Sequence, residues 1–237
     1  MSRVLIQLAR ILVAPRQQFD EFLNGIPVVV PLILVLVTGG IYVGVTALYT
    51  DDQTYKGHLQ DHASVQEEVD ILSEDTLEQL QRNIENPQGI EAAKRNTTFM
   101  APLIYAISFS IGLVLLASYY WVASLSFESK IGWSNWFGFA CWAAVPTVYG
   151  SLISAALIAL FGIEWKNALS PLTWIGWTQP WAVLFTIPLV WIVLISIQGL
   201  RSWGNKRIGT SVIVVLVPYL VYILLGSFFM GIPAIVA

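Results

Sequence analysis

The sequence has 237 residues, of which 56% are hydrophobic and only 11% charged, and its mean hydropathy is +0.68. Charged residues make up about a quarter of a soluble globular protein, so this composition excludes that class and indicates an integral membrane protein. The net charge of −3 arises mainly from one segment, because eleven of the fifteen acidic residues lie between Asp51 and Glu91.

Residues 1–24 predict an amphipathic segment on the cytoplasmic membrane surface. A cleaved signal peptide is a poor match, because Arg10 interrupts the apolar run and Pro15 follows without a small-residue cleavage site. Apolar residues recur at the i, i+3, i+4, i+7 spacing that gathers them on one face of a helix. The residues expected to contact the membrane interface are Leu5, Leu8, Leu12 and Phe19.

Five long apolar stretches follow, and each is long enough to cross the membrane as a helix. About 20 helical residues cover roughly 30 Å of hydrocarbon, and a backbone inside lipid must satisfy its own hydrogen bonds. No stretch has a charged residue or a histidine in its interior. The expected fold is therefore an all-α integral membrane protein, with one five-span domain over residues 25–237. The stretches are residues 26–49, 99–127, 133–162, 181–200 and 208–237.

Residues 50–98, the acidic insert, separate the first two stretches. Apolar residues recur at helical spacing around Val69 and again around Leu80, and Asn86, Pro87 and Gly89 then break the pattern. We expect two short helices outside the membrane. A solvated acidic linker is the alternative that composition alone supports.

His58 and His62 in the insert are the weak candidates for a metal site. Their spacing of four residues would place two imidazoles on one face of a helix, near the carboxylate of Asp61. Such a spacing is common by chance, and no third ligand has a fixed position. We expect solvated side chains and no metal, and the sequence indicates no other cofactor.

Basic residues indicate the topology. Three arginines precede the first stretch, Lys130 follows the second, and Arg201, Lys206 and Arg207 follow the fourth. These segments lie on one side if the spans alternate, and the positive-inside rule makes that side cytoplasmic. The N-terminus is then cytoplasmic, and the C-terminus and the acidic insert are extracytoplasmic.

Prolines and small residues within the stretches indicate how the helices pack. Pro146, Pro188 and Pro218 are expected to kink their spans, as the broken helices of transporters do. Gly40 and Gly44 have the GxxxG spacing that lets two helices approach closely. Close approach within one chain and self-association both remain open, so the oligomeric state is undecided and a homo-oligomer is one alternative.

The residue types favour a non-enzymatic function. No nucleotide-binding loop, nucleophile elbow or paired catalytic carboxylates are present, and nothing indicates nucleic-acid binding. The single cysteine, Cys141, lies in an apolar stretch and is expected to be a small buried residue. The leading hypothesis is a membrane protein that organises lipids or protein partners. The alternative is a transporter or channel for a neutral or lipid-like solute through the kinked bundle.

Three segments resemble a known family. The N-terminal sequence LARILVAPRQQFDEF, continued by GIPVVVPLILVLVTGG, has Pro15 and Phe19 ahead of the first stretch. WFGFACWAAVPTVYGSLIS leads through small and aromatic residues to Pro146, and WIVLISIQGLRSWGNKRIGTSVIVVLVPYL joins two apolar runs through a basic turn. In this order the segments resemble the Yip family of membrane proteins, particularly its bacterial members.

The resemblance implies a five-span domain with a cytoplasmic N-terminus, located in a bacterial member in the inner membrane. In eukaryotic relatives it implies trafficking functions and binding of Rab-type GTPases. This chain differs from them in its short N-terminal segment and its long acidic insert, so GTPase binding is not carried over. The family offers no catalytic residues to transfer.

Overall fold

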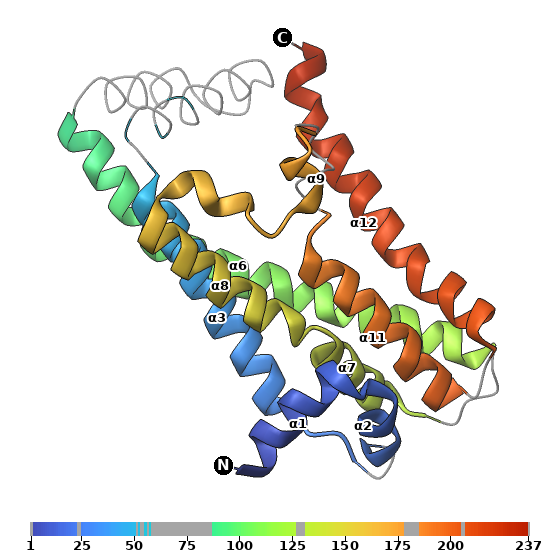
Figure 1. The fold of residues 1–237 in the computed structure, drawn as a ribbon. Helices are drawn as coiled ribbons and strands as arrows, with labels where there is room; N and C mark the ends of the chain where they lie inside the picture. The colour runs from blue at the N-terminus through green and yellow to red at the C-terminus, as the bar shows by residue number, and fades with distance from the viewer. Residues whose placement is uncertain are drawn as a thin grey trace.

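The computed structural model describes residues 2–22, 25–50, 52, 55, 57, 87–126, 131–177, 185–204 and 207–236, and every regular element in these ranges is helical. Two short helices, α1 (Ser2–Val13) and α2 (Pro15–Phe22), come first (Figure 1). The remaining elements are α3 (Val29–Tyr49), α6 (Pro87–Leu125), α7 (Trp133–Ala143), α8 (Pro146–Phe161), the 3₁₀ helix η1 (Ile163–Asn167), α9 (Pro171–Trp174), α11 (Ile187–Gly204) and α12 (Ile208–Val236).

Within the described ranges, four helical segments are long and apolar enough to cross a membrane. They are α3, α6, α7 together with α8, and α11. The helix α12 runs for 29 residues, but the apolar run found among its described residues ends at Val221. The prediction of an all-helical, multi-pass membrane protein is confirmed. That the chain crosses the membrane five times stays a prediction.

The long helices contact one another in a closed ring. α3 contacts α8, α8 contacts α11, α11 contacts α12, α12 contacts α6, and α6 contacts α3. α7 contacts α3, α6 and α11, and therefore fills the ring near one end. That end also holds α1 and α2 (Figure 1), and we call it the hairpin end. The opposite end holds the end of α3, the start of α6 and η1, and we call it the insert end.

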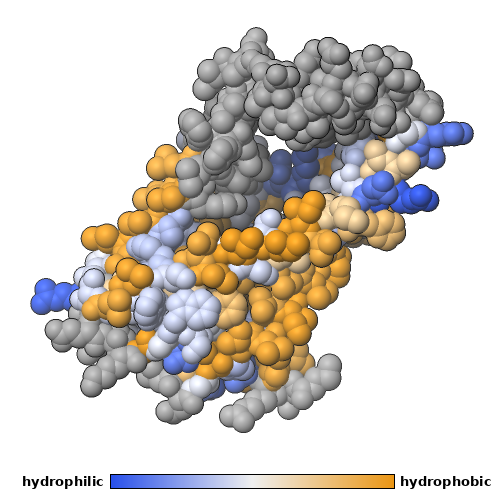
Figure 2. Space-filling view, turned by 180° about the vertical axis from the view of Figure 1, so that it is seen from behind, coloured by the Kyte–Doolittle hydropathy of each residue, from blue (hydrophilic) through white to orange (hydrophobic). Residues whose placement is uncertain are grey.

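The outer surface of the ring is apolar. Along α6, large hydrophobic side chains are exposed at successive turns, including Leu103, Ile107, Ile111 and Leu115. Figure 2 shows apolar residues covering much of one face of the molecule, with hydrophilic residues gathered towards its ends. A soluble protein rarely exposes a contiguous apolar surface of this kind, whereas hydrocarbon chains cover it well.

The helix α6 is much longer than the span predicted from residue 99. It has 39 residues, which correspond to about 58 Å at 1.5 Å per residue, while the hydrocarbon layer is about 30 Å thick. Pro87 is its first residue, where a missing N–H costs nothing, and Gly89 lies inside it. A helix therefore begins at Pro87, twelve residues before the predicted span, and its length exceeds the thickness of the hydrocarbon layer. The helical pattern predicted ahead of it falls on residues outside the described ranges.

The prolines have two different roles. Pro146 begins α8 after a two-residue break that follows α7, and Pro188 is the second residue of α11. Pro102 and Pro218 lie inside α6 and α12. The third apolar stretch is thus broken at Pro146, as predicted, whereas the kink predicted at Pro188 is wrong because a proline in the first turn removes no hydrogen bond of the helix.

Candidate functional site

The helices α1 and α2 form an N-terminal hairpin that is fixed to α11. The indole Nε1 of Trp203 donates to the carbonyl oxygen of Phe19 at 2.8 Å, and that of Trp191 donates to the carbonyl oxygen of Leu12 at 3.3 Å. The Ser202 hydroxyl donates to the carboxylate of Asp20. These bonds join residues about 180 positions apart, so the hairpin is part of the folded domain.

Aromatic side chains from the hairpin and the ring form a plug at the hairpin end. Phe19 stacks on Phe139 of α7 with 4.7 Å between ring centroids, and it meets Trp203 edge to face at 5.8 Å. Phe22 packs on Trp142 at 4.9 Å. Aromatic pairs at these distances add about 0.5–1.5 kcal/mol each to the burial of their surface. The aromatic plug consists of Phe19, Phe22, Tyr120, Trp136, Phe139, Trp142 and Trp203.

The burial of the hairpin corrects two of the predicted membrane contacts. Phe19 has no exposed surface and Leu8 is only 8% exposed, so both contact protein instead of lipid. Leu12 is half-buried against the same core, whereas Leu5 is 60% exposed. The amphipathic stripe predicted from the sequence is real, but protein covers most of it. A second, outward face of α1 is also apolar, with Leu5, Ile6 and Val13 exposed.

The tryptophans near the span ends also divide into two groups. Trp136 and Trp203 are buried in the plug, although the sequence places them near the ends of apolar stretches, where tryptophans commonly form an aromatic belt at the membrane surface. Trp174 and Trp177 are exposed at the insert end, where such a belt would lie.

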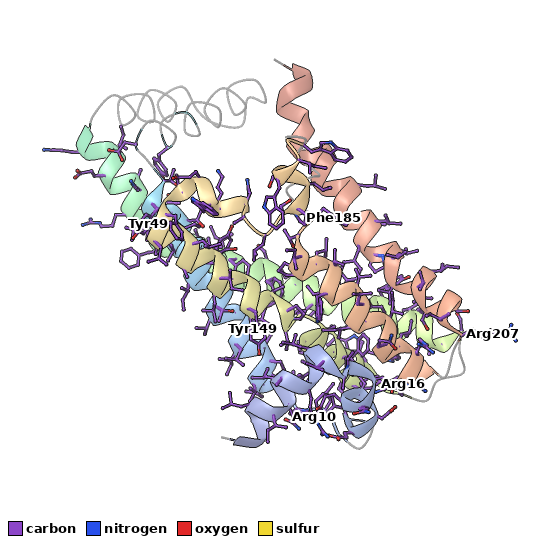
Figure 3. All side chains as sticks on the ribbon, in the orientation of Figure 1. Arg10, Arg16, Tyr49, Tyr149, Phe185 and Arg207 are labelled. Atoms are coloured by element: carbon purple, nitrogen blue, oxygen red, sulfur yellow. The ribbon has the colours of Figure 1, made fainter. Side chains whose placement is uncertain are left out.

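Several arginine side chains lie at the hairpin end of the bundle. Arg10, Arg16 and Arg207 lie at the hairpin end, whereas Tyr49 and Phe185 lie at the insert end (Figure 3). Arg10 pairs with Glu21 at 2.7 Å between α1 and α2, and both side chains are about half exposed. An exposed pair of this kind stabilises the hairpin by at most about 1 kcal/mol.

The glycines of α3 allow close packing within the chain. A Cβ atom at Gly40 or Gly44 would lie 3.5 Å from the Pro102 ring of α6, which is ordinary van der Waals contact. A Cβ atom at Gly39 would overlap the ring of Tyr105. The GxxxG pair therefore faces α6 of the same chain, and at Gly39 the Tyr105 ring of α6 would have to shift to admit a side chain.

A tyrosine satisfies the carbonyl that Pro218 leaves without its helical partner. Proline has no N–H, so the carbonyl of Val214, four residues earlier, loses its bond inside α12. The hydroxyl of Tyr119 on α6 donates to this oxygen at 2.8 Å. The bond joins α6 to α12 where the ring closes, and hydrogen bonds between membrane helices contribute on the order of 1 kcal/mol.

A cavity of about 250 Å³ lies between α3, α6, α8 and α11 at the insert end. Most of its lining residues carry hydroxyl groups, and Lys166 is the single charged residue among the described ones. At its edge the two helices α8 and α11 are in close contact, because a Cβ atom at Gly150 would lie 2.5 Å from the Pro188 ring. The lining residues include Tyr42, Tyr105, Thr147, Ser151, Ser154, Asn167, Ser170 and Thr186.

The weak metal candidates His58 and His62 lie outside the described residues, as do the two predicted insert helices. In the part of the chain that is described, no three His, Cys, Asp or Glu side chains come together in a way that could hold a metal ion. Cys141 is buried and free, as predicted.

A family model, the Yip1 domain, matches residues 9–230. The chain belongs to the Yip1 domain family. The match includes the N-terminal hairpin from Ala9 onwards as well as the ring, and it confirms the resemblance drawn from the sequence motifs. Comparisons with curated proteins and with solved structures find no significant match.

The cavity is the feature that the sequence did not predict. Its residues come from segments as distant as Tyr42 and Thr186, and most of them are ordinary hydroxyl residues in apolar stretches. The one available signal was that Ser151 and Ser154 share a helix face three residues apart. Small residues at that spacing indicate close helix packing at least as often as a cavity.

Proposed function

We propose that this Yip1 domain protein is a non-enzymatic membrane scaffold that organises lipids and protein partners at the surface where its N-terminal hairpin lies. The observation that carries the proposal is the position of α1. Its inner face is fixed to the bundle, and its outer face exposes Leu5, Ile6 and Val13 at the end that also carries arginines. An apolar face beside basic residues suits the boundary between acyl chains and anionic head groups.

We further propose five spans, with the hairpin end cytoplasmic and the C-terminus on the opposite side of a bacterial inner membrane. Arg10, Arg16 and Arg207 lie at the hairpin end (Figure 3), and Arg201 precedes Ser202, which bonds to the hairpin. This distribution supports a cytoplasmic hairpin end under the positive-inside rule. The helical backbone of α12 reaches Val236, which is long enough for the fifth crossing.

A test of the scaffold changes only the outer face of α1. The triple variant Leu5→Ser, Ile6→Ser, Val13→Ser removes its apolar surface and leaves the buried Leu8 and Phe19 in place. We expect the purified variant to stay folded but to carry less bound lipid and fewer co-purifying proteins. Ala9→Ser, an exposed change on the same helix, is the control. Identical lipid and protein partners in wild type and triple variant would refute the proposal.

The cavity favours transport as a second candidate function. A hydroxyl-lined space among membrane-spanning helices resembles the binding chambers of transporters, but the aromatic plug occupies the other end of the ring. A transporter would have to move that plug. Flux of glycerol into proteoliposomes that Ser151→Leu abolishes would favour transport, and absence of flux would leave the scaffold as the better account.

A further inference from the structure

Two serine hydroxyls in the cavity have no hydrogen-bond partner among the described residues. Ser154 is only 6% exposed, and Ser151 lies one turn earlier on the same face of α8. Both line the cavity. Ser154 is buried and Ser151 is half-buried, so a group that fills the cavity would meet both hydroxyls.

Other hydroxyls in the spans avoid this cost by bonding to their own helix. Thr46 donates to the carbonyl of Tyr42, Ser110 to that of Ala106, and Ser118 to that of Val114, each four residues earlier. This is the ordinary arrangement of serine and threonine in an apolar helix. Ser151 and Ser154 do not adopt it, so their protons stay available to a group inside the cavity.

The neighbouring side chains offer acceptors to the same group. The hydroxyl of Thr147 donates to the carbonyl of Ala144 at 2.7 Å, and that of Tyr42 donates to the carbonyl of Lys166 at 3.4 Å. Each oxygen donates its proton in this bond and can still accept a hydrogen bond from another group. Thr186 has the opposite role, because its oxygen accepts the N–H of Leu189 at 3.3 Å and its proton remains to be donated.

This mixture of donors and acceptors determines the class of ligand. A phosphate or carboxylate needs donors and compensating charge, but Lys166 is exposed and no other charged residue is described in the lining. A polyol presents hydroxyls that both donate and accept. The volume of about 250 Å³ is slightly below the ~300–1,000 Å³ of typical ligand pockets, so the cavity accommodates one small unit.

We infer that the cavity binds an uncharged, hydroxyl-rich group of the size of a glycerol or sugar unit, and that Ser151 and Ser154 donate hydrogen bonds to it. The group is either the head of a lipid in the surrounding leaflet or a free polyol. The inference does not depend on the scaffold proposal, which concerns the opposite end of the molecule.

The test compares lipids that differ only in their head groups, bound to the full-length protein in detergent. Phosphatidylglycerol has a second glycerol as its head group, and phosphatidic acid is anionic without that head group. Phosphatidylcholine also lacks the glycerol head group and has no net charge. Binding is measured by native mass spectrometry, with free glycerol as a separate titration. The variants are Ser151→Ala with Ser154→Ala, and Ser151→Ala alone. Ser108→Ala, an exposed serine on α6, is the control.

We expect phosphatidylglycerol to bind wild type about tenfold more tightly than either other lipid, and the double variant to lose that preference. Glycerol binding that depends on the two serines, without any lipid preference, would support the same site and identify a free polyol as the ligand. Should the double variant fail to fold, Ser151→Ala alone gives the answer, because this partly exposed serine has no bond to lose. Equal binding of phosphatidic acid and phosphatidylglycerol, or full binding by the serine variants, would overturn the inference.

Discussion

At the scale of single residues, Gly39 marks a position on α3 where the Tyr105 ring of α6 occupies the space of a side chain. A methyl group there would overlap the Tyr105 ring, whereas one at Gly40 meets Pro102 at an ordinary distance. We expect Gly39→Ala to destabilise the protein by about 1–3 kcal/mol, since the overpacked ring must move. Gly40→Ala should leave stability nearly unchanged. Thermal unfolding in detergent distinguishes them, and equal effects at both positions would contradict the packing described here.

Tyr119 and Pro218 provide a second test at this scale. Tyr119→Phe removes the bond to the Val214 carbonyl and should cost about 1 kcal/mol or less, in keeping with hydrogen bonds between membrane helices. Pro218→Ala restores the N–H that this carbonyl lacks. In the Pro218→Ala background the cost of Tyr119→Phe should therefore shrink, as a double-mutant cycle would measure.

The control for this cycle is Tyr149→Phe, an exposed tyrosine on α8 without a described hydrogen bond. Its substitution should change the unfolding temperature little in either background. A Tyr119→Phe cost that is the same with and without Pro218 would mean that the two residues are independent.

Single residues also set a limit on prediction from sequence. The spacing of Gly40 and Gly44 indicates a packing face, and α6 does cover it. The sequence does not reveal that Gly39 is the sterically restricted position, because that depends on where Tyr105 of another helix places its ring. Pairs such as Tyr119 with Val214 depend in the same way on the register between two helices.

At the scale of elements, the N-terminal hairpin has one face that contacts protein and another that is exposed to the surroundings, and substitutions on the two faces should have different effects. Phe19→Ala empties the centre of the aromatic plug and should destabilise the protein by about 3 kcal/mol or more. Leu5→Ala, at a position 60% exposed, should leave the unfolding temperature almost unchanged and weaken only contacts with lipid. Unfolding followed by tryptophan fluorescence reports the difference. A mild Phe19→Ala effect would mean that the hairpin is not docked.

The hairpin also explains why the sequence predicted an amphipathic helix correctly and misplaced its contacts. Periodicity shows that one face is apolar. It contains no information on whether lipid or protein covers that face, since both are apolar. Leu8 and Phe19 face protein because α7 and α11 return to this end of the bundle.

At the scale of the whole molecule, the proposed sidedness can be tested with single cysteines. Cys141 is buried, so Cys141→Ala gives a background without a native thiol. Arg16→Cys, on the hairpin, and Lys166→Cys, in η1, then lie at opposite ends, and both residues are exposed. A membrane-impermeant maleimide added to intact cells should label position 166 and spare position 16 until the cells are opened. Labelling of both positions from outside would reject the proposed topology.

Composition and charge predict much at this scale, because the length of apolar runs and the distribution of arginines follow from the bilayer itself. The order of helices in the ring is different. It depends on which faces meet, and the cavity exists only because α3, α6, α8 and α11 do not fill the space between them. Neither property is visible in any one segment.

The docking of the hairpin has a consequence for biogenesis. Phe19 and Asp20 are synthesised before their partners Ser202 and Trp203, which follow more than 180 positions later. During translation these early side chains have no finished binding site, and the loop to be closed spans most of the chain. A nascent chain that stops before α11 would therefore leave the hairpin of α1 and α2 undocked, and a quality-control protease could recognise the undocked helices.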